Sequence, residues 1–199
     1  MKRISTGLIS LLSLILPFIA TAASETYVLD PEHTYVQWGV SHFGFSTVSG
    51  KWMANGTLEL DEANPQNSKL NVEIPLSNIA TGIPILDERL KSNLFFDVAK
   101  YPTATFVSDK IERTGKKTAK VHGTLTLHGV SKPVTLSVVL NKEGMHPYAK
   151  KKALGFSAKT TVKRSDFGIS LYADKGVSDT VNIEIEAEAE PKTAEAKAK

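Results

Sequence analysis

The chain has 199 residues, of which 24 are lysine or arginine and 21 are aspartate or glutamate, and it contains no cysteine. The absence of cysteine excludes disulfides, thiol catalysis and thiolate metal sites. The nearly balanced charge argues against a nucleic-acid partner, which needs a concentrated basic face on the protein. No apolar run after the first 22 residues approaches membrane-spanning length, so we expect no stable membrane insertion.

The first 22 residues have the pattern of an export signal. Lys2 and Arg3 precede an apolar stretch over residues 7–20, and small residues follow it. The stretch is shorter than the ~20 apolar residues that span a bilayer, so we expect a removable signal peptide over residues 1–22 rather than an anchor. Cleavage near Ala22, or one residue later, would leave a periplasmic or secreted protein with 22 basic and 21 acidic residues. Its 177 residues fit one domain.

Apolar and polar residues alternate with a period of two along most of this domain, which is typical of strands in a sheet with one wet face. In residues 181–189 the odd positions are apolar, whereas most of the intervening even positions are glutamate. The pattern predicts eight strands, over residues 35–42, 47–60, 69–75, 104–113, 119–128, 134–141, 153–163 and 177–188. Asn55 and Gly56 indicate a bend within the second of these strands.

One segment has a helical period instead. Ile83, Leu86, Leu90 and Leu94 share one face, and Pro84 suits a first turn, so we expect a short helix between the third and fourth strands. Residues 191–199 contain no large apolar residue, and we expect a disordered tail after a domain spanning residues 23–190.

Eight antiparallel strands with one apolar face can form a sandwich or a barrel. Closure removes the edge strands that invite aggregation, so we expect an all-β, eight-stranded antiparallel barrel with one short helical segment. The interior of such a barrel is just wide enough to be filled by side chains or to hold one small ligand. The function depends on which of these two applies.

The residues resemble the YceI family in blocks that span nearly all of this domain. The opening block is Tyr27-x-Leu29-Asp30-x-x-His33, and Val40-x-His42-x-Gly44 and Val48-x-Gly50-x-Trp52 follow it. The next blocks in order are Ile79-x-Thr81-Gly82, Asp87-x-x-Leu90-Lys91-Ser92-x-x-Phe95-Phe96-Asp97 and Tyr101-Pro102-x-Ala104-x-Phe106. Later blocks lie at residues 123–134 and 164–168. The resemblance implies a lipocalin-like barrel, periplasmic or secreted, that binds a polyisoprenoid or a similar long amphiphile. It implies no established catalysis and no cofactor.

Aromatic and apolar residues concentrated in these blocks are the candidates for an apolar lining of the interior. They are Phe43, Phe45, Trp52, Leu90, Phe95, Phe96, Phe106, Phe156 and Phe167. Each of them can equally serve as ordinary core. Polar candidates for contacts with a ligand headgroup at the barrel mouth are His33, His42, Asp87, Arg89 and Lys91.

Histidines raise the question of a metal site. His122 and His128 lie six residues apart, about 20 Å along an extended strand, which is too far for them to share one ion. Zinc needs three or four convergent ligands, and the sequence shows no tight ligand cluster, so we expect no metal site.

Three functions remain open from the sequence. The first is a non-catalytic carrier of an isoprenoid-type lipid. The second is an enzyme that acts on a lipid-like substrate through histidine and aspartate at the barrel mouth. The third is a packed barrel that serves as a stress or interaction protein, with its acidic last strand or the lysines at residues 150–152 meeting a partner. A homodimer is left open in all three cases.

Overall fold

The computed structural model describes residues 24–173 and 175–192. The expected signal peptide therefore lies wholly outside the described residues, as does most of the expected tail. Within the described ranges, no helix is long and apolar enough to cross a membrane.

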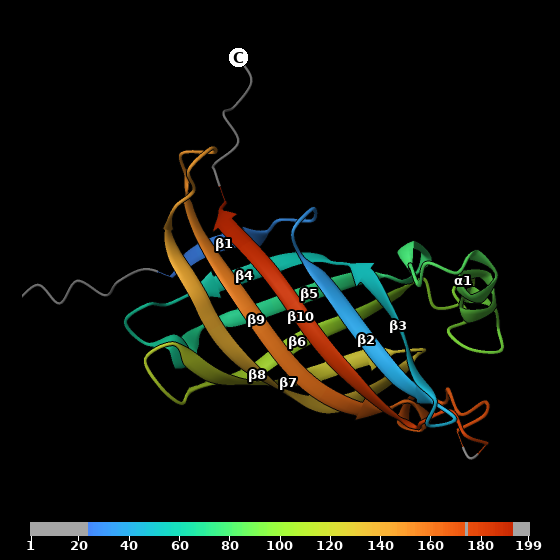
Figure 1. The fold of residues 1–199 in the computed structure, drawn as a ribbon. Helices are drawn as coiled ribbons and strands as arrows, with labels where there is room; N and C mark the ends of the chain where they lie inside the picture. The colour runs from blue at the N-terminus through green and yellow to red at the C-terminus, as the bar shows by residue number, and fades with distance from the viewer. Residues whose placement is uncertain (1–23, 174, 193–199) are drawn as a thin grey trace, which may run out of the picture.

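The chain folds into one antiparallel sheet of ten segments that closes on itself (Figure 1). The segments follow the order β1-β4-β5-β6-β7-β8-β9-β10-β2-β3, and a pairing between β1 and β10 closes the ring. Their bounds are β1 Glu25–Leu29, β2 Tyr35–His42, β3 Ser46–Met53, β4 Asn55–Leu60, β5 Lys69–Pro75, β6 Thr103–Arg113, β7 Thr118–Leu127, β8 Val130–Met145, β9 Lys152–Lys163 and β10 Thr180–Pro191.

Four of these segments form two kinked strands, so the ring is the expected eight-stranded barrel. β1 and β2 lie one after the other along the same edge of β10, separated by a turn over residues 30–34. β3 and β4 pair with β2 and β1 respectively and are separated by Ala54 alone. The break next to Asn55 and Gly56 agrees with the bend expected there.

The structure corrects two expected boundaries. The first strand does not begin at residue 35, because β1 precedes it and joins β10 to β4. The tail does not begin at residue 191, because Pro191 pairs with Tyr27 and the Lys192 backbone N–H donates to the Thr26 carbonyl. Residues 193–199 lie outside the described ranges.

The barrel has two different ends (Figure 1). One end carries α1 Pro84–Lys91 together with the β2–β3, β7–β8 and β9–β10 connections, and we call it the helix end. The other end carries the β4–β5 loop, the β6–β7 and β8–β9 hairpins, and the start of β1, and we call it the hairpin end. Three short 3₁₀ segments, η1 Pro65–Asn67, η2 Leu76–Asn78 and η3 Arg164–Phe167, lie in the connections.

The helix is shorter than the apolar period suggested. Leu90 is buried and Leu86 packs against the core, whereas Ile83 and Leu94 lie just outside α1 and are half exposed. Pro84 occupies the first turn, as expected, because its missing N–H has no helical partner there.

Candidate ligand cavity

The barrel encloses a cavity of about 460 Å³. Its wall consists mainly of inward-facing aliphatic and aromatic side chains from β4 through β10. β8 shows how the sequence builds this wall, since Val134, Leu136, Val138 and Leu140 face the cavity at every second position. A cavity of this size lies within the ~300–1,000 Å³ of typical small-molecule sites.

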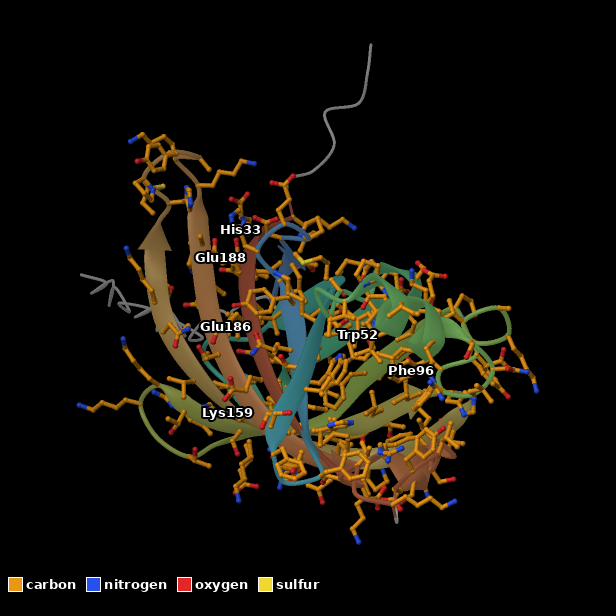
Figure 2. All side chains as sticks on the ribbon, turned by 45° about the vertical axis from the view of Figure 1, so that its right-hand side comes forward. His33, Trp52, Phe96, Lys159, Glu186 and Glu188 are labelled. Carbon is orange, nitrogen blue, oxygen red and sulfur yellow. The ribbon has the colours of Figure 1, made fainter. Side chains whose placement is uncertain are left out.

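The cavity is blocked at the helix end by a cluster of aromatic side chains. Trp52 lines the cavity, and its indole N–H donates to the Leu76 carbonyl at 3.3 Å. Phe96 packs edge-on against Trp52 with ring centroids 5.2 Å apart (Figure 2). The ring centroid of Trp38 lies 5.9 Å from that of Trp52. Leu90 of α1 belongs to the same core cluster. The helix therefore covers this end of the barrel.

The cavity reaches the loops at the hairpin end. Residues of the β4–β5 loop and of the β6–β7 hairpin line it there, and all of the titratable side chains of the lining lie at this end. We call these residues the rim, and they are Glu62, Arg113, Lys116, Lys117 and Glu143. The remainder of the lining carries no titratable side chain. The interior therefore suits an apolar part of a ligand, and the rim suits a polar group.

Lys152, at the start of β9, forms ion pairs with the two glutamates of the rim. Its ammonium lies 2.6 Å from a Glu62 carboxylate oxygen, 3.1 Å from Glu143 and 3.9 Å from Glu25. It also lies over the ring of Tyr27, 5.8 Å from the centroid. The hydrogen bond to Glu62 is the main cause of a strongly raised Lys152 pKa, so the lysine is charged at any physiological pH.

The structure distributes the nine expected lining residues over three environments. Trp52, Phe106 and Phe156 face the cavity. Leu90, Phe95 and Phe96 belong to the core cluster of the helix end rather than to the cavity wall. Their contact with a ligand remains a prediction in each case.

Phe43, Phe45 and Phe167 do not line the cavity. Phe43 and Phe45 sit at the β2–β3 turn, where Phe43 and Gly44 adopt positive φ angles, and Phe45 is 91% exposed. The turn points these rings outward, which corrects the expectation of an interior position. Phe167 is buried in η3 outside the cavity, and its carbonyl lies 3.0 Å from His128 Nδ1.

The expected polar mouth is also corrected, because four of its five residues lie at the blocked helix end. Asp87 accepts hydrogen bonds from the Thr81 backbone N–H and hydroxyl, and Arg89 donates to the Tyr172 hydroxyl at 3.0 Å. Lys91 pairs with Glu88 at 3.0 Å, and the His42 ring packs against Phe43. Asp87 and Arg89 thus fasten α1 to neighbouring loops, whereas the Lys91 pair lies within α1. The rim that surrounds the opening was missed, although the charged residues near Gly115 were a signal in the sequence.

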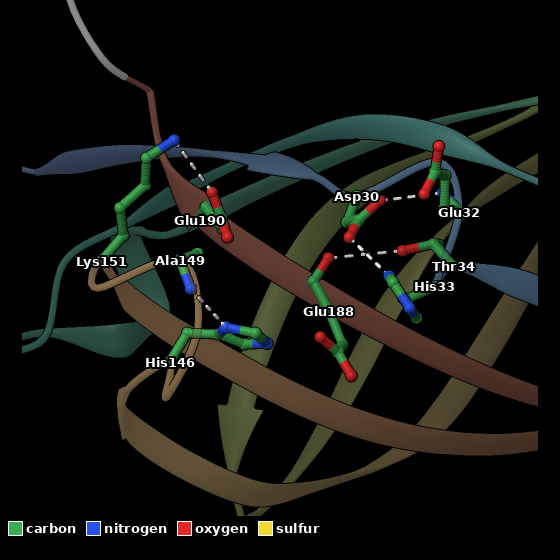
Figure 3. A network of polar contacts seen from close by, with 9 residues as sticks. All are labelled: Asp30, Glu32, His33, Thr34, His146, Ala149, Lys151, Glu188 and Glu190. Atoms are coloured by element: carbon green, nitrogen blue, oxygen red, sulfur yellow. Dashed lines mark hydrogen bonds and ion pairs between the residues drawn. The ribbon is translucent and has the colours of Figure 1, made fainter.

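His33 lies in the turn between β1 and β2, on the outer surface of the barrel (Figure 3). Its Nδ1 lies 2.7 Å from Asp30 Oδ2, and the other Asp30 oxygen accepts from the Glu32 backbone N–H. The hydrogen bond to Asp30 raises the His33 pKa. Burial acts to raise the Asp30 pKa, but the hydrogen bonds from His33 and Glu32 outweigh it and hold that pKa below its usual value.

Asp30, His33 and Glu188 are the only group of three potential metal ligands within residues 24–173 and 175–192, with ligand atoms within 4.8 Å of one another. The ion pair between Asp30 and His33 already satisfies two of the three groups. His33 is 60% exposed, and none of the three residues lines the cavity. The geometry therefore identifies a surface ion pair next to Glu188.

Comparison with known proteins agrees with this architecture. The profile of the YceI-like domain matches residues 27–189. The chain belongs to the YceI family. A UPF0312 protein of Pseudomonas savastanoi pv. phaseolicola is 39% identical over 170 residues, which cover 84% of this chain and 87% of that protein. A UPF0312 protein of Pseudomonas syringae pv. tomato is 40% identical over 167 residues, which cover 82% of this chain and 85% of that one.

Solved structures show the same fold. A YceI protein of Campylobacter jejuni has a TM-score of 0.67 and 31% identity, covering 75% of this chain and 88% of its own. BcnA of Burkholderia cenocepacia has a TM-score of 0.72 and 23% identity, covering 80% and 98%. A polyisoprenoid-binding domain of Saccharophagus degradans has a TM-score of 0.63 and 19% identity, covering 83% and 98%. The lipocalin-like barrel of this YceI chain is thus shared with distant relatives.

Proposed function

We propose that this YceI protein is a non-catalytic carrier, periplasmic or secreted, that holds a polyisoprenoid or a similar long-chain amphipathic lipid inside its barrel. The observation that carries the proposal is the apolar cavity, whose titratable residues are confined to the rim. The description of the Saccharophagus degradans domain as polyisoprenoid-binding supports the ligand class. The export pattern of residues 1–22 supports the location.

Burial of the tail supplies the binding energy. Each methylene removed from water contributes about 0.8 kcal/mol, so about fifteen buried carbons give roughly 12 kcal/mol before the costs of association are subtracted. Those costs are of the order of 4–15 kcal/mol. Micromolar binding needs a net of about 8 kcal/mol, so about fifteen buried carbons suffice only at the lower end of those costs, and higher costs require a longer tail.

Catalysis on a lipid-like substrate has weaker support. Asp30 and His33 form the carboxylate–imidazole pair that such an enzyme would use, but both lie outside the cavity wall. Acid–base catalysis needs the catalytic group within hydrogen-bond reach of the reacting atom. The cavity therefore supports binding better than turnover.

The proposal is tested by purifying the protein from the periplasm of an expressing bacterium and extracting it with organic solvent. Mass spectrometry of the extract should detect one long-chain compound in a stoichiometric amount, and the intact mass of the protein should show loss of residues 1–22 or 1–23. An empty protein that also fails to bind an apolar fluorescent probe would contradict the carrier. A protein that keeps its N-terminal segment would contradict export by cleavage.

A further inference from the structure

The cavity has one blocked end, and this limits how a lipid can lie in it. At the helix end the lining residues Trp52 and Leu76 are themselves covered by Phe96 and by the core cluster that contains Leu90. Figure 2 shows Trp52 and Phe96 next to each other on this side of the barrel. At the hairpin end the lining consists of loop residues with charged side chains. A polar headgroup is stable only at the second of these ends, because burying it at the first would cost its hydration.

The depth of the cavity follows from β6, which lines it from Ala104 near the blocked end to Arg113 at the rim. These positions are nine residues apart, which is about 30 Å along the strand at ~3.3 Å per residue. Strands of such barrels tilt by about 35–45° from the axis, so the depth along the axis is roughly 20–25 Å.

This depth corresponds to a limited length of isoprenoid tail. An extended polypeptide advances about 3.3–3.6 Å for every three backbone bonds, or about 1.2 Å per bond. An isoprene unit adds four bonds to the chain and therefore about 4.6 Å, so roughly five units fill the depth. Divided by this depth, the volume of about 460 Å³ gives a mean cross-section of roughly 20 Å², which favours a single run of chain over a folded one.

We propose that the cavity limits the length of lipid tail that it encloses and that contributes to affinity. The tail enters first from the hairpin end and stops against Trp52 and Leu76, up to about five isoprene units are enclosed, and the headgroup stays at the rim. This inference rests on the proposed function and adds a length limit and a direction to it. It also places the headgroup at the end opposite to α1.

The test is a series of prenyl alcohols with tails of one to nine isoprene units, each displacing an apolar fluorescent probe from the delipidated protein. We expect affinity to rise about tenfold or more per unit for short tails and to change less than about threefold beyond five units. A nine-unit tail that gains affinity as steeply as a three-unit tail would overturn the length limit. Failure of every alcohol to displace a bound probe would contradict the proposed function instead.

Matched variants locate the limit. Ala104 and Ala119 both line the cavity, but Ala104 lies near the blocked end and Ala119 near the rim. Ala104→Leu should move the plateau down by about one isoprene unit, while Ala119→Leu should leave its position unchanged. Leu76→Ala should move it up, because part of the block is removed. Two outcomes would contradict a length limit set at the helix end. One is an equal shift of the plateau in both leucine variants, and the other is an unchanged plateau in a folded Ala104→Leu variant.

Discussion

Ala158 offers a way to distinguish a hollow barrel from a packed one. It is buried in the middle of β9 and faces the cavity. In the Ala158→Phe variant the ring extends into space that the structure shows as empty. Burial of a phenylalanine side chain contributes about 1.5–3 kcal/mol, and the loss of rotamer freedom costs about 0.5–1 kcal/mol. We expect the ligand-free variant to be about 1–2 kcal/mol more stable than the natural protein.

A packed interior predicts the opposite sign. Adding a ring to a filled core forces side chains and backbone apart and costs about 1–3 kcal/mol. The two interpretations therefore differ by about 2–5 kcal/mol, and urea unfolding of delipidated protein resolves such a difference. The midpoint should rise in Ala158→Phe, and a lowered midpoint would refute the hollow barrel.

Binding should change in the opposite direction to stability. The new ring occupies the path of the tail, so affinity for an apolar probe should fall by at least about tenfold in Ala158→Phe. Thr161→Phe is the matched control, since Thr161 lies three residues further along β9 and is exposed. It should change the stability by less than about 0.5 kcal/mol and leave probe binding intact. Loss of binding in both variants would show that the effect is not due to the cavity.

Three further substitutions test other parts of the structure. Lys152→Met removes the ammonium that pairs with Glu62 and Glu143 of the rim, and because the lysine is about one-third exposed we expect the free energy of unfolding in urea to fall by about 1 kcal/mol. That loss should shrink in 1 M salt, and a salt-independent loss would point to packing instead. Arg164→Lys should cost about 2–4 kcal/mol, because the buried guanidinium donates to four backbone carbonyls of the β9–β10 connection. A change below 0.5 kcal/mol would refute this role. For His33, whose raised pKa lies above 6.5, the ion pair with Asp30 loses its contribution as the pH rises through that pKa. The ion pair also loses its contribution to stability as the pH falls through the Asp30 pKa, which lies below 3.8. His33→Ala should therefore destabilise the protein more at pH 5.5 than at pH 9, and equal effects at both would contradict the pairing.

The barrel itself was predictable from the sequence, because inward and outward positions alternate and closure leaves no edge strand exposed. The two kinks differ in how far they could be predicted. Asn55 and Gly56 indicated the bend between β3 and β4, although the apolar pattern does not clearly change there. β1 has only five residues and ends in the Asp30 turn, so its pairing with β10 depends on distant parts of the chain that no local pattern reveals.

The site was predictable only in part, and the reason is geometric. Residue type identifies Phe106 and Phe45 equally well as apolar, but the former lies within a strand and the latter at a turn tip. The sequence also predicts a helix, but it does not indicate that Leu90 packs this helix against the core at one end of the barrel. Which end of the barrel is open depends on that packing, so the polar candidates His42, Asp87, Arg89 and Lys91 were expected at an end that α1 covers.

A crystal structure of the delipidated protein with a four-unit prenyl alcohol tests the central claim most directly. The account predicts continuous electron density for one chain inside the barrel, from Trp52 to the rim, with its hydroxyl group at the hairpin end. An interior filled by rearranged side chains, or a ligand bound only on the outer surface, would contradict it.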